Sequence, residues 1–301
     1  MFIENLPKKF LLQNSITYPP TSNGENFELY FFTRFMEETP ELNHTYIPIQ
    51  WTNYFIKNNY GHNIDSLKSY IPNALNKDSK YFTVVQFAGG TLVELPNNIF
   101  FSMGGMFNTQ ISSSSKIVKL PLVYETSKKN NIDLFKYKKN KKYLASFVGR
   151  PTHEIRLKLE NLYSSNNNFY IKNIDADKYT DKKNIKLFKS LLNNSYFSIC
   201  PRGYGPTSYR LYESILSGVV PVYVSDEFFL PYQEFLNWSE FSVLINNKDI
   251  EDLDVILEKK ITSGEYLRLQ KKLNEIKHKF FNYEFMYAYV LDQLKIIKKS
   301  N

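Results

Sequence analysis

The chain has 301 residues, a formal net charge of +8 at pH 7 and an aromatic content of 16%. This length is sufficient for two domains with separate hydrophobic cores, and the aromatic content excludes an intrinsically disordered chain. The lysines are scattered along the sequence, so most of the positive charge is expected on solvated surfaces and not in a nucleic-acid site.

Residues 1–135 are predicted to form an N-terminal α/β domain. Apolar residues at helical spacing predict a helix at 26–38, and apolar runs predict strands at 45–51, 81–87, 98–102 and 116–120. Pro48 indicates that 45–51 is an edge or bulged strand. Pro72 is expected to break or kink a partly helical segment at 63–76.

The sequence predicts a cytoplasmic protein. The first residues contain no apolar run of signal-peptide length, and no stretch reaches the roughly 18 apolar residues that a membrane-spanning helix needs. We therefore expect no transmembrane segment, although the lysines could contact a membrane peripherally. The lone Cys200 excludes an internal disulfide and fits a reducing compartment, and its place at a strand end indicates a small buried hydrophobic residue.

A lysine-rich connector at 136–142 precedes a second domain at 143–280. Strands and helices alternate in this domain, which is typical of a parallel, Rossmann-like sheet. The expected strands are 143–148, 168–173, 195–200, 219–224 and 241–245, and the expected helices are 153–163, 184–193 and a short one from about 207 to 217. The tail from 250 onward is predicted to be helical, and its last helix, 281–301, could cross back to the first domain.

The most informative stretch is the glycine-rich loop Pro201–Pro206, which lies between the strand 195–200 and a short helix. Open α/β sheets bind ligands at such a place, the carboxyl end of a strand and the amino end of a helix. Arg202 and Arg210 flank the helix start, and no acid occurs before Glu213. Guanidinium groups beside unpaired backbone N–H groups favour a phosphate or diphosphate, whereas Glu213 suits a ribose. From spacing alone, an ordinary turn with arginines paired elsewhere explains the pattern equally well.

A resemblance to a known family adds to this interpretation. The string CPRGYGPTSYRLYESILSGVVPVYVSDEFFLPYQEFLNWSEFSV closely resembles the exostosin family of glycosyltransferases in both order and spacing. A second segment, YLASFVGRPTHEIR at 143–156, resembles the opening of that family's donor-binding domain. The resemblance implies a GT-B fold, with two Rossmann-like domains facing a cleft and a helical C-terminal tail. It also implies inverting transfer of a sugar from a nucleotide diphosphate donor, with UDP expected, to a glycan or lipid-linked saccharide.

The resemblance also implies which residues bind the donor. Arg150 would enter the same crevice as Arg202 and Arg210, where three arginines stabilise the charge that develops on a leaving diphosphate. Arg150 and Arg210 are therefore candidate catalytic residues, and Thr152 is expected to cap the next helix. The predicted donor-binding residues are Arg150, Arg156, Arg202, Gly203, Gly205, Thr207, Ser208, Arg210, Glu213 and Asp226.

No metal or other cofactor is expected, because the arginines and the helix N-terminus take the place of a cation. Asp175 and Asp177 have the spacing of a metal-binding Asp-x-Asp motif, and we interpret them as part of a loop.

An inverting transferase also needs a general base, which the N-terminal domain should supply. Family members commonly carry an acid or a His-Asp pair after the strand at 81–87, where this chain has two glycines. Glu94 is the nearest candidate, followed by His44 and His62. The glycine-containing loop at 102–105 is a candidate mobile element on the acceptor side.

Two other functions remain open beside sugar transfer. The missing acid is compatible with an inactive partner that binds a sugar nucleotide or a glycan for another transferase. The positive charge suggests a nucleic-acid binder, but the sequence lacks the usual nucleic-acid-binding patterns, so no nucleic-acid partner is expected. Transfer from a UDP-sugar is the leading interpretation.

Overall fold

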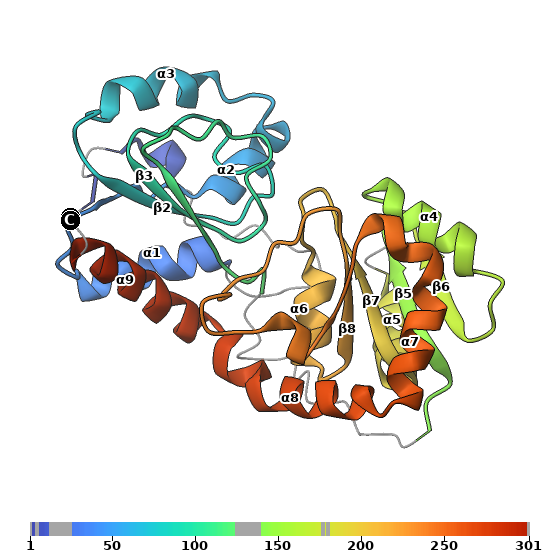
Figure 1. The fold of residues 1–301 in the computed structure, drawn as a ribbon. Coiled ribbons are helices and arrows are strands. Elements are labelled where there is room, and N and C mark those ends of the chain that lie inside the picture. Colours follow the sequence, from blue (N-terminus) through green and yellow to red (C-terminus); the bar gives the residue numbers. More distant parts are fainter. Residues whose placement is uncertain are drawn as a thin grey trace. The chain divides into compact units, whose positions relative to one another are not determined.

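The computed structural model describes residues 2–3, 6–11, 26–123, 140–175, 178 and 181–299. The chain forms two compact units: unit 1 comprises Met1–Glu125 and Asn282–Asn301, and unit 2 comprises Thr126–Phe281. Each unit contains one parallel sheet with helices packed against it (Figure 1). The predicted fold class, α/β with two parallel sheets and C-terminal helices, is confirmed. The cleft between the two units stays a prediction.

Unit 1 has a four-stranded sheet in the order β1-β2-β3-β4, and every pair of neighbouring strands is parallel. Its elements are η1 (Lys8–Phe10), α1 (Phe27–Glu38), β1 (Thr45–Tyr46), α2 (Trp51–Lys57), η2 (Asn59–Gly61), α3 (Asp65–Ala74), β2 (Tyr81–Val85), β3 (Asn98–Ser102), β4 (Lys116–Lys119) and α9 (Tyr283–Lys299). Both central strands, β2 and β3, are buried along their whole length, as expected for a sheet that is covered on both faces.

Alternate residues of β2 and β3 supply the two cores of unit 1. On one face, Phe100 packs in a cluster with Trp51 and Phe55 of α2 and Leu67 of α3. On the other face, Phe31 of α1 forms ring contacts with Tyr46, Phe82 and Tyr287, which is on α9. The helices α1 and α9 lie on the opposite side of the sheet from α2 and α3 (Figure 1).

The C-terminal helix α9 packs on α1 through charge as well as aromatic rings. Arg34 pairs with Glu38 of its own helix and with Glu284 of α9. The Arg34 guanidinium also lies 4.7 Å from the ring centroid of Tyr287, within the range of a cation–π contact. The last helix of the sequence is therefore part of the N-terminal unit.

Three local details of unit 1 differ from the sequence expectation. The predicted strand 45–51 is reduced to β1, because Pro48 has no N–H to donate and Trp51 already begins α2. Pro72 does not break the helix 63–76, since it lies inside the last turn of α3, which ends at Ala74. The strand predicted to run to residue 87 ends at Val85.

Unit 2 has a five-stranded parallel sheet in the order β6-β5-β7-β8-β9. Its elements are β5 (Tyr143–Gly149), α4 (Glu154–Tyr163), β6 (Phe169–Asn173), α5 (Lys182–Asn194), β7 (Ser195–Pro201), α6 (Tyr209–Leu216), β8 (Val220–Val224), η4 (Trp238–Glu240), β9 (Val243–Ile245), η5 (Asn247–Asp252), α7 (Leu253–Thr262) and α8 (Glu265–Phe280). After β5 the chain forms β6, which pairs with one edge of β5, and then β7, which pairs with the opposite edge of β5. The strand order therefore reverses between β5 and β7, the topological switch point at which open α/β sheets bind ligands.

The helix α6 is short but deeply buried, because it packs on both β7 and β8. Leu211, Tyr212 and Ile215 are at most 1% exposed. The helix ends at Gly218, as predicted, where φ is +70° and a side chain would approach the Asn274 side chain to 2.7 Å.

The remaining predictions for the tail and the connector have mixed outcomes. The helical tail is confirmed as α7, α8 and α9. Most of the predicted connector, 136–139, lies outside the described residues. In the part of the chain that the structure describes, no helix is both long enough and apolar enough to span a bilayer.

Candidate functional site

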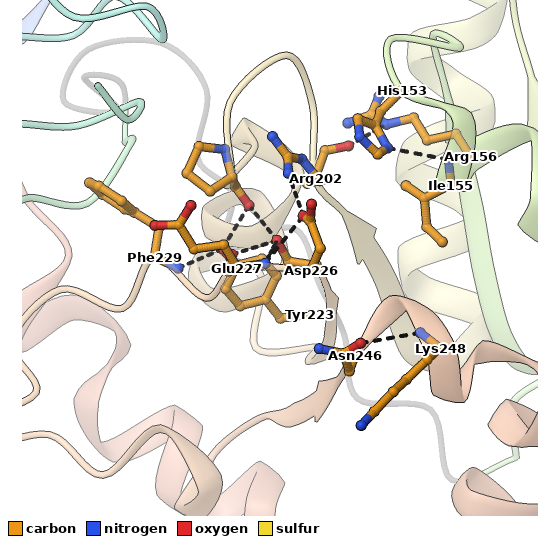
Figure 2. A network of polar contacts seen from close by, with 12 residues as sticks. His153, Ile155, Arg156, Arg202, Tyr223, Asp226, Glu227, Phe229, Asn246 and Lys248 are labelled. Atoms are coloured by element: carbon orange, nitrogen blue, oxygen red, sulfur yellow. Dashed lines mark hydrogen bonds and ion pairs between the residues drawn. The ribbon is translucent and has the colours of Figure 1, made fainter. Parts of the chain in front are cut away.

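The candidate site lies at the switch point of unit 2, where three strand ends meet. The strand β7 pairs with β5 on one side and with β8 on the other, so the loops that follow these strands are neighbours. Arg150 and His153 follow β5, Arg202 follows β7, and Asp226 follows β8. Figure 2 shows His153, Arg202 and Asp226. The predicted donor residues of the two matching segments are thus brought to one edge of one sheet.

Arg202 and Asp226 form an ion pair across the ends of β7 and β8 (Figure 2). Burial alone would raise the pKa of Asp226, but the hydrogen bond and charge of Arg202 outweigh it, so the pKa lies below its usual value. Arg202 uses Nη1 for this bond, while its buried Nε has no partner among the described residues. One donor of Arg202 is therefore left for a further acceptor.

The start of α6 is incomplete as a helix N-terminus. Ser208 occupies the N-cap position without capping the helix, and the first turn contains no acid. The hydroxyl oxygens of Ser208 and of Thr152, from the facing loop, are buried and have no hydrogen-bond partner among the described residues. Buried polar atoms normally find partners, and helix N-termini attract anions, so this cluster has the character of an anion site.

Three further predicted residues of this loop are small and buried. Gly203 brings the loop close to the preceding one, because a side chain there would lie 3.7 Å from the Thr152 hydroxyl and 3.5 Å from Arg156 Nη2. Gly205 and Thr207 are also buried, and the carbonyl of Thr207 accepts a hydrogen bond from the Gly203 N–H at 3.2 Å. These residues carry no charge, and Gly203 lets the two loops approach each other closely.

Arg210 and Glu213 differ from the sequence expectation, because they bind each other. Arg210 Nε donates to Glu213 Oε2 at 3.2 Å, and both side chains are under 10% exposed. Arg210 Nη1 donates to the Val148 carbonyl at 2.8 Å, and its guanidinium stacks 3.9 Å from the ring centroid of Phe188. A contact with phosphate or ribose would have to replace these bonds or add to them, so both roles stay predictions.

Arg150 is a predicted cation whose side chain binds no other group among the described residues. Its side chain is half-buried, and within the described part of the chain its guanidinium has no hydrogen-bond or ion-pair partner. Arg156, by contrast, is buried, and its guanidinium donates to three backbone carbonyls of the crevice. In the structure Arg156 therefore binds the protein backbone, whereas the sequence predicts a direct contact with the nucleotide sugar.

His153 is a site residue that the sequence analysis missed. Its Nδ1 accepts a hydrogen bond from the Ile155 N–H at 3.3 Å, so His153 caps α4, and the prediction that Thr152 does so is wrong. Burial and the charge of Arg202 lower the pKa of His153, against the opposing effect of Asp226. The signal available in the sequence was the position of His153 immediately before a helix.

The loop after β8 is fixed by Tyr223 and Ser225 (Figure 2). The Tyr223 hydroxyl donates to the Pro206 carbonyl at 2.8 Å and accepts from the Phe229 N–H at 3.0 Å. The Ser225 hydroxyl donates to the Glu227 carbonyl at 2.5 Å. These bonds hold Asp226 beside the glycine-rich loop.

In unit 1, the candidate base Glu94 lies at the wrong edge of the sheet for a ligand. The carbonyl of the next residue, Leu95, accepts from Ser115 Oγ, which also accepts from the Asn98 N–H at the amino end of β3. Ligands of open parallel sheets bind at carboxyl ends, so the structure does not favour Glu94. His44, at the amino end of β1, is buried, and His62 is exposed in the turn after η2.

Among the described residues, an acid at the carboxyl edge of unit 1 is Glu28, which the sequence analysis did not identify. Its carboxyl group is fully buried and accepts from the N–H of Thr52, at the start of α2, and from the N–H of Gln86, the residue after β2. Burial raises the pKa of Glu28 to about 7 against the opposing effect of these bonds. The glycine loop 102–105 lies close by, since a side chain at Gly104 would approach the Gln86 carbonyl to 2.7 Å.

Two other sequence features have no place in the site. Asp175 pairs with Lys178 on the surface, and Asp177 lies outside the described residues. Cys200 is buried, and burial raises the pKa of its thiol to about 11, which makes it a packing residue and not a nucleophile.

Comparison with known proteins places this geometry in a family. Residues 82–260 match a model of the exostosin GT47 domain. A "probable glycosyltransferase" of Arabidopsis thaliana is 36% identical over 93 residues, which are 31% of this chain and 18% of that protein. A "probable glucuronosyltransferase" of Oryza sativa subsp. japonica is 32% identical over 35% of this chain and 22% of that protein. A "probable beta-1,4-xylosyltransferase" of Arabidopsis thaliana is 35% identical over 27% of this chain and 20% of that protein.

The chain thus matches only about a fifth of the length of these relatives. Among solved structures, TarM is similar at 10% identity and a TM-score of 0.42, over 90% of this chain and 58% of that one, which is too distant to support an argument. The family match, in contrast, spans more than half of the chain and includes both loops of the switch point. The chain therefore belongs to the exostosin GT47 family.

Proposed function

We propose that the chain is a glycosyltransferase that binds a nucleoside-diphosphate sugar, with UDP as the nucleotide, at the switch point of unit 2. One observation carries the proposal: unpartnered polar atoms of Arg202, Thr152 and Ser208 surround the uncapped start of α6. A diphosphate would accept hydrogen bonds from all of these groups and from the backbone N–H groups of the helix start. Family membership supports the same assignment.

In the proposed reaction, an acceptor hydroxyl attacks the anomeric carbon and loses its proton to a general base, while the bond between that carbon and the diphosphate breaks. Negative charge then develops on the leaving diphosphate, and Arg150, Arg202 and the helix start stabilise it. Because these charges belong to the protein, the proposal requires no metal ion or other cofactor. Asp226 and Glu227, at the rim of the same crevice, are placed to accept hydrogen bonds from sugar hydroxyls.

The acceptor is proposed to be a glycan or another saccharide, bound on the side of unit 1. Inversion at the anomeric carbon requires a base, and neither acid considered in unit 1 meets that requirement. Glu94 lies at the amino edge of the sheet, and Glu28 is 1% exposed. This observation favours a second candidate function, an inactive partner that binds the sugar nucleotide without transferring it. A cytoplasmic location and a peripheral contact with membranes stay predictions.

An assay of UDP release separates the two functions. The full chain is incubated with a panel of UDP-sugars, with and without saccharide acceptors, and UDP is measured together with the binding of each donor. Acceptor-dependent release that is lost in Arg202→Ala supports a transferase. Donor binding without release on any acceptor supports the inactive partner, and the absence of binding to every nucleotide contradicts both.

A further inference from the structure

We infer that Arg156 is a positioning residue, which fixes the two loops that carry Arg150 and Arg202 and acts on the ligand only through them. The inference rests on the proposed function for the identity of the ligand, a nucleoside diphosphate. It assigns Arg156 a role distinct from that of the other arginines of the crevice.

The guanidinium of Arg156 donates three hydrogen bonds to backbone carbonyls. Its Nε donates to the Arg202 carbonyl at 2.9 Å, its Nη1 to the Arg150 carbonyl at 2.9 Å, and its Nη2 to the Pro201 carbonyl at 3.0 Å. The side chain is 7% exposed. One planar guanidinium therefore ties the end of β5 to the end of β7, across the point where the strand order reverses.

The surroundings of Arg156 fit its guanidinium closely. The group lies 5.3 Å from the ring centroid of Phe147, and the two glycines that flank it leave room for the plane. A side chain on Gly149 would come within 3.6 Å of Nη1, and one on Gly203 within 3.5 Å of Nη2. The backbone of Arg156 is held in turn, because Asn173 Nδ2 donates to its carbonyl at 2.9 Å.

These bonds explain how buried Arg156 controls the positions of Arg150 and Arg202. Two of the three carbonyls belong to Arg150 and Arg202, so Arg156 sets the backbone position from which those side chains leave. It also offsets the negative ends of three carbonyl dipoles that would otherwise repel an anion in the crevice. Lysine would keep the charge, but its single ammonium group cannot reproduce the fork that reaches three separate oxygens.

The first test is a double-mutant cycle read by titration calorimetry of UDP with the full chain. Arg156→Lys is expected to weaken UDP about tenfold, the size typical of residues that orient a binding group. In an Arg202→Ala background, Arg156→Lys is expected to weaken UDP binding less than about threefold, because one of the two side chains through which Arg156 acts on UDP is already absent. An undiminished tenfold loss would mean direct contact with the ligand, and a fall in melting temperature with unchanged affinity would mean a purely structural role. Either result overturns the inference.

The second test does not depend on the ligand. Hydrogen exchange is measured at the Thr152 and Gly203 amides, which donate to the Arg150 and Thr207 carbonyls. Arg156→Lys should accelerate both amides at least about tenfold, because the loops lose their common anchor. The matched control is Lys158→Ala. Lys158 is a cation of the same helix, and it pairs with Glu251 on the surface. Its removal should change neither the exchange of these amides nor the affinity for UDP.

The two tests separate the possible failures. If the wild type binds no UDP but the variant accelerates exchange in both loops, the proposed function fails and the positioning of the loops stands. If exchange in Arg156→Lys matches the wild type, the inference fails whatever the affinity for UDP.

Discussion

The two units use buried charge at the carboxyl edges of their sheets in opposite ways. In unit 1 the charge is the carboxyl group of Glu28, which accepts from backbone N–H groups at the start of α2 and after β2. In unit 2 it is the guanidinium of Arg156, which donates to three backbone carbonyls after β5 and β7. One edge is organised around a hydrogen-bond acceptor, the Glu28 carboxyl group, and the other around a hydrogen-bond donor, the Arg156 guanidinium.

The difference shows which edge is prepared for an anionic ligand. Two helix starts of unit 1 are satisfied by side chains of the same unit, since Asn26 caps α1 and the Glu28 carboxyl group accepts from the Thr52 N–H in the first turn of α2. In unit 2 the carbonyls are satisfied by Arg156, whereas the start of α6 is left without a cap or an acid. An acid at a helix start competes with a bound phosphate for the same N–H groups, so its absence from α6 leaves the N–H groups beside the switch point available to an anion.

The largest expected effect is on unit 1. Glu28→Ala removes the acceptor of two buried N–H groups and of the Thr52 hydroxyl, and should lower the free energy of unfolding by about 3 kcal/mol or more. Urea unfolding of the full chain measures this. A change below about 1 kcal/mol would contradict the account, because it would mean that the carboxyl group does not organise this edge.

Glu28 also gives unit 1 a pH dependence. Its pKa is raised from 4.5 to about 7 in the folded state, so the folded chain holds a proton between these values that the unfolded chain has released. The stabilising effect of that proton is complete below pH 4.5 and is lost as the pH rises through about 7, a change of about 3 kcal/mol. Glu28→Gln should flatten the profile. An unchanged profile would assign the pH dependence to another group.

The next effect concerns the anion site itself. Arg202→Ala removes a donor to the diphosphate and leaves Asp226 unpaired beside it, so UDP binding should weaken by about 2 kcal/mol, roughly 30-fold. Arg268→Ala removes the same charge from α8, where the side chain is 78% exposed, and should leave binding unchanged. Equal losses of UDP affinity in both variants would mean that the effect arises from the net charge of the chain and not from a contact with Arg202.

A smaller effect is expected from a substitution that gives the start of α6 a side-chain cap, like the cap of α1 in unit 1. Ser208→Asp should cap the helix and raise the free energy of unfolding by about 1 kcal/mol, while its charge opposes a phosphate at the same N–H groups. Ser208→Asn, which caps without charge as Asn26 does in α1, is the control that separates capping from repulsion. Tighter UDP binding by the aspartate variant would rule out a phosphate at this position.

The smallest effect is expected at His153. The pKa of this residue is lowered in the folded state by burial and by the charges of Arg202 and Arg156, against Asp226 and Glu154. Its stabilising contribution as a cap is therefore complete above pH 6.5 and lost as the pH falls, by about 0.5–1 kcal/mol. His153→Asn caps without titrating, so unfolding between pH 7 and 5 should depend less on pH in this variant.

Much of the fold follows from local sequence patterns, and the site does so only in part. The alternation of strands and helices in unit 2, the glycine-rich loop and the stop at Gly218 depend on residues close in sequence, and all were predicted. The partners of the buried charges depend on distant segments. Arg156 binds a carbonyl 46 residues away, and Glu28 binds an amide 58 residues away.

Choices between neighbouring residues were also beyond the sequence pattern. Thr152 and His153 can both cap a helix, and the backbone geometry selects His153. Arg210 and Glu213 lie three residues apart on α6, and the sequence does not reveal that they pair with each other. Their spacing is equally compatible with a pair and with two separate ligand contacts.

The central claim, that the switch point of unit 2 binds a nucleoside diphosphate through its phosphates, is tested most directly by calorimetric titration of UDP and of uridine. The account predicts that UDP binds at least about tenfold more tightly than uridine, and that most of this difference disappears in Arg202→Ala. Equal affinities for UDP and uridine, or a difference that survives Arg202→Ala and Arg150→Ala alike, would contradict it.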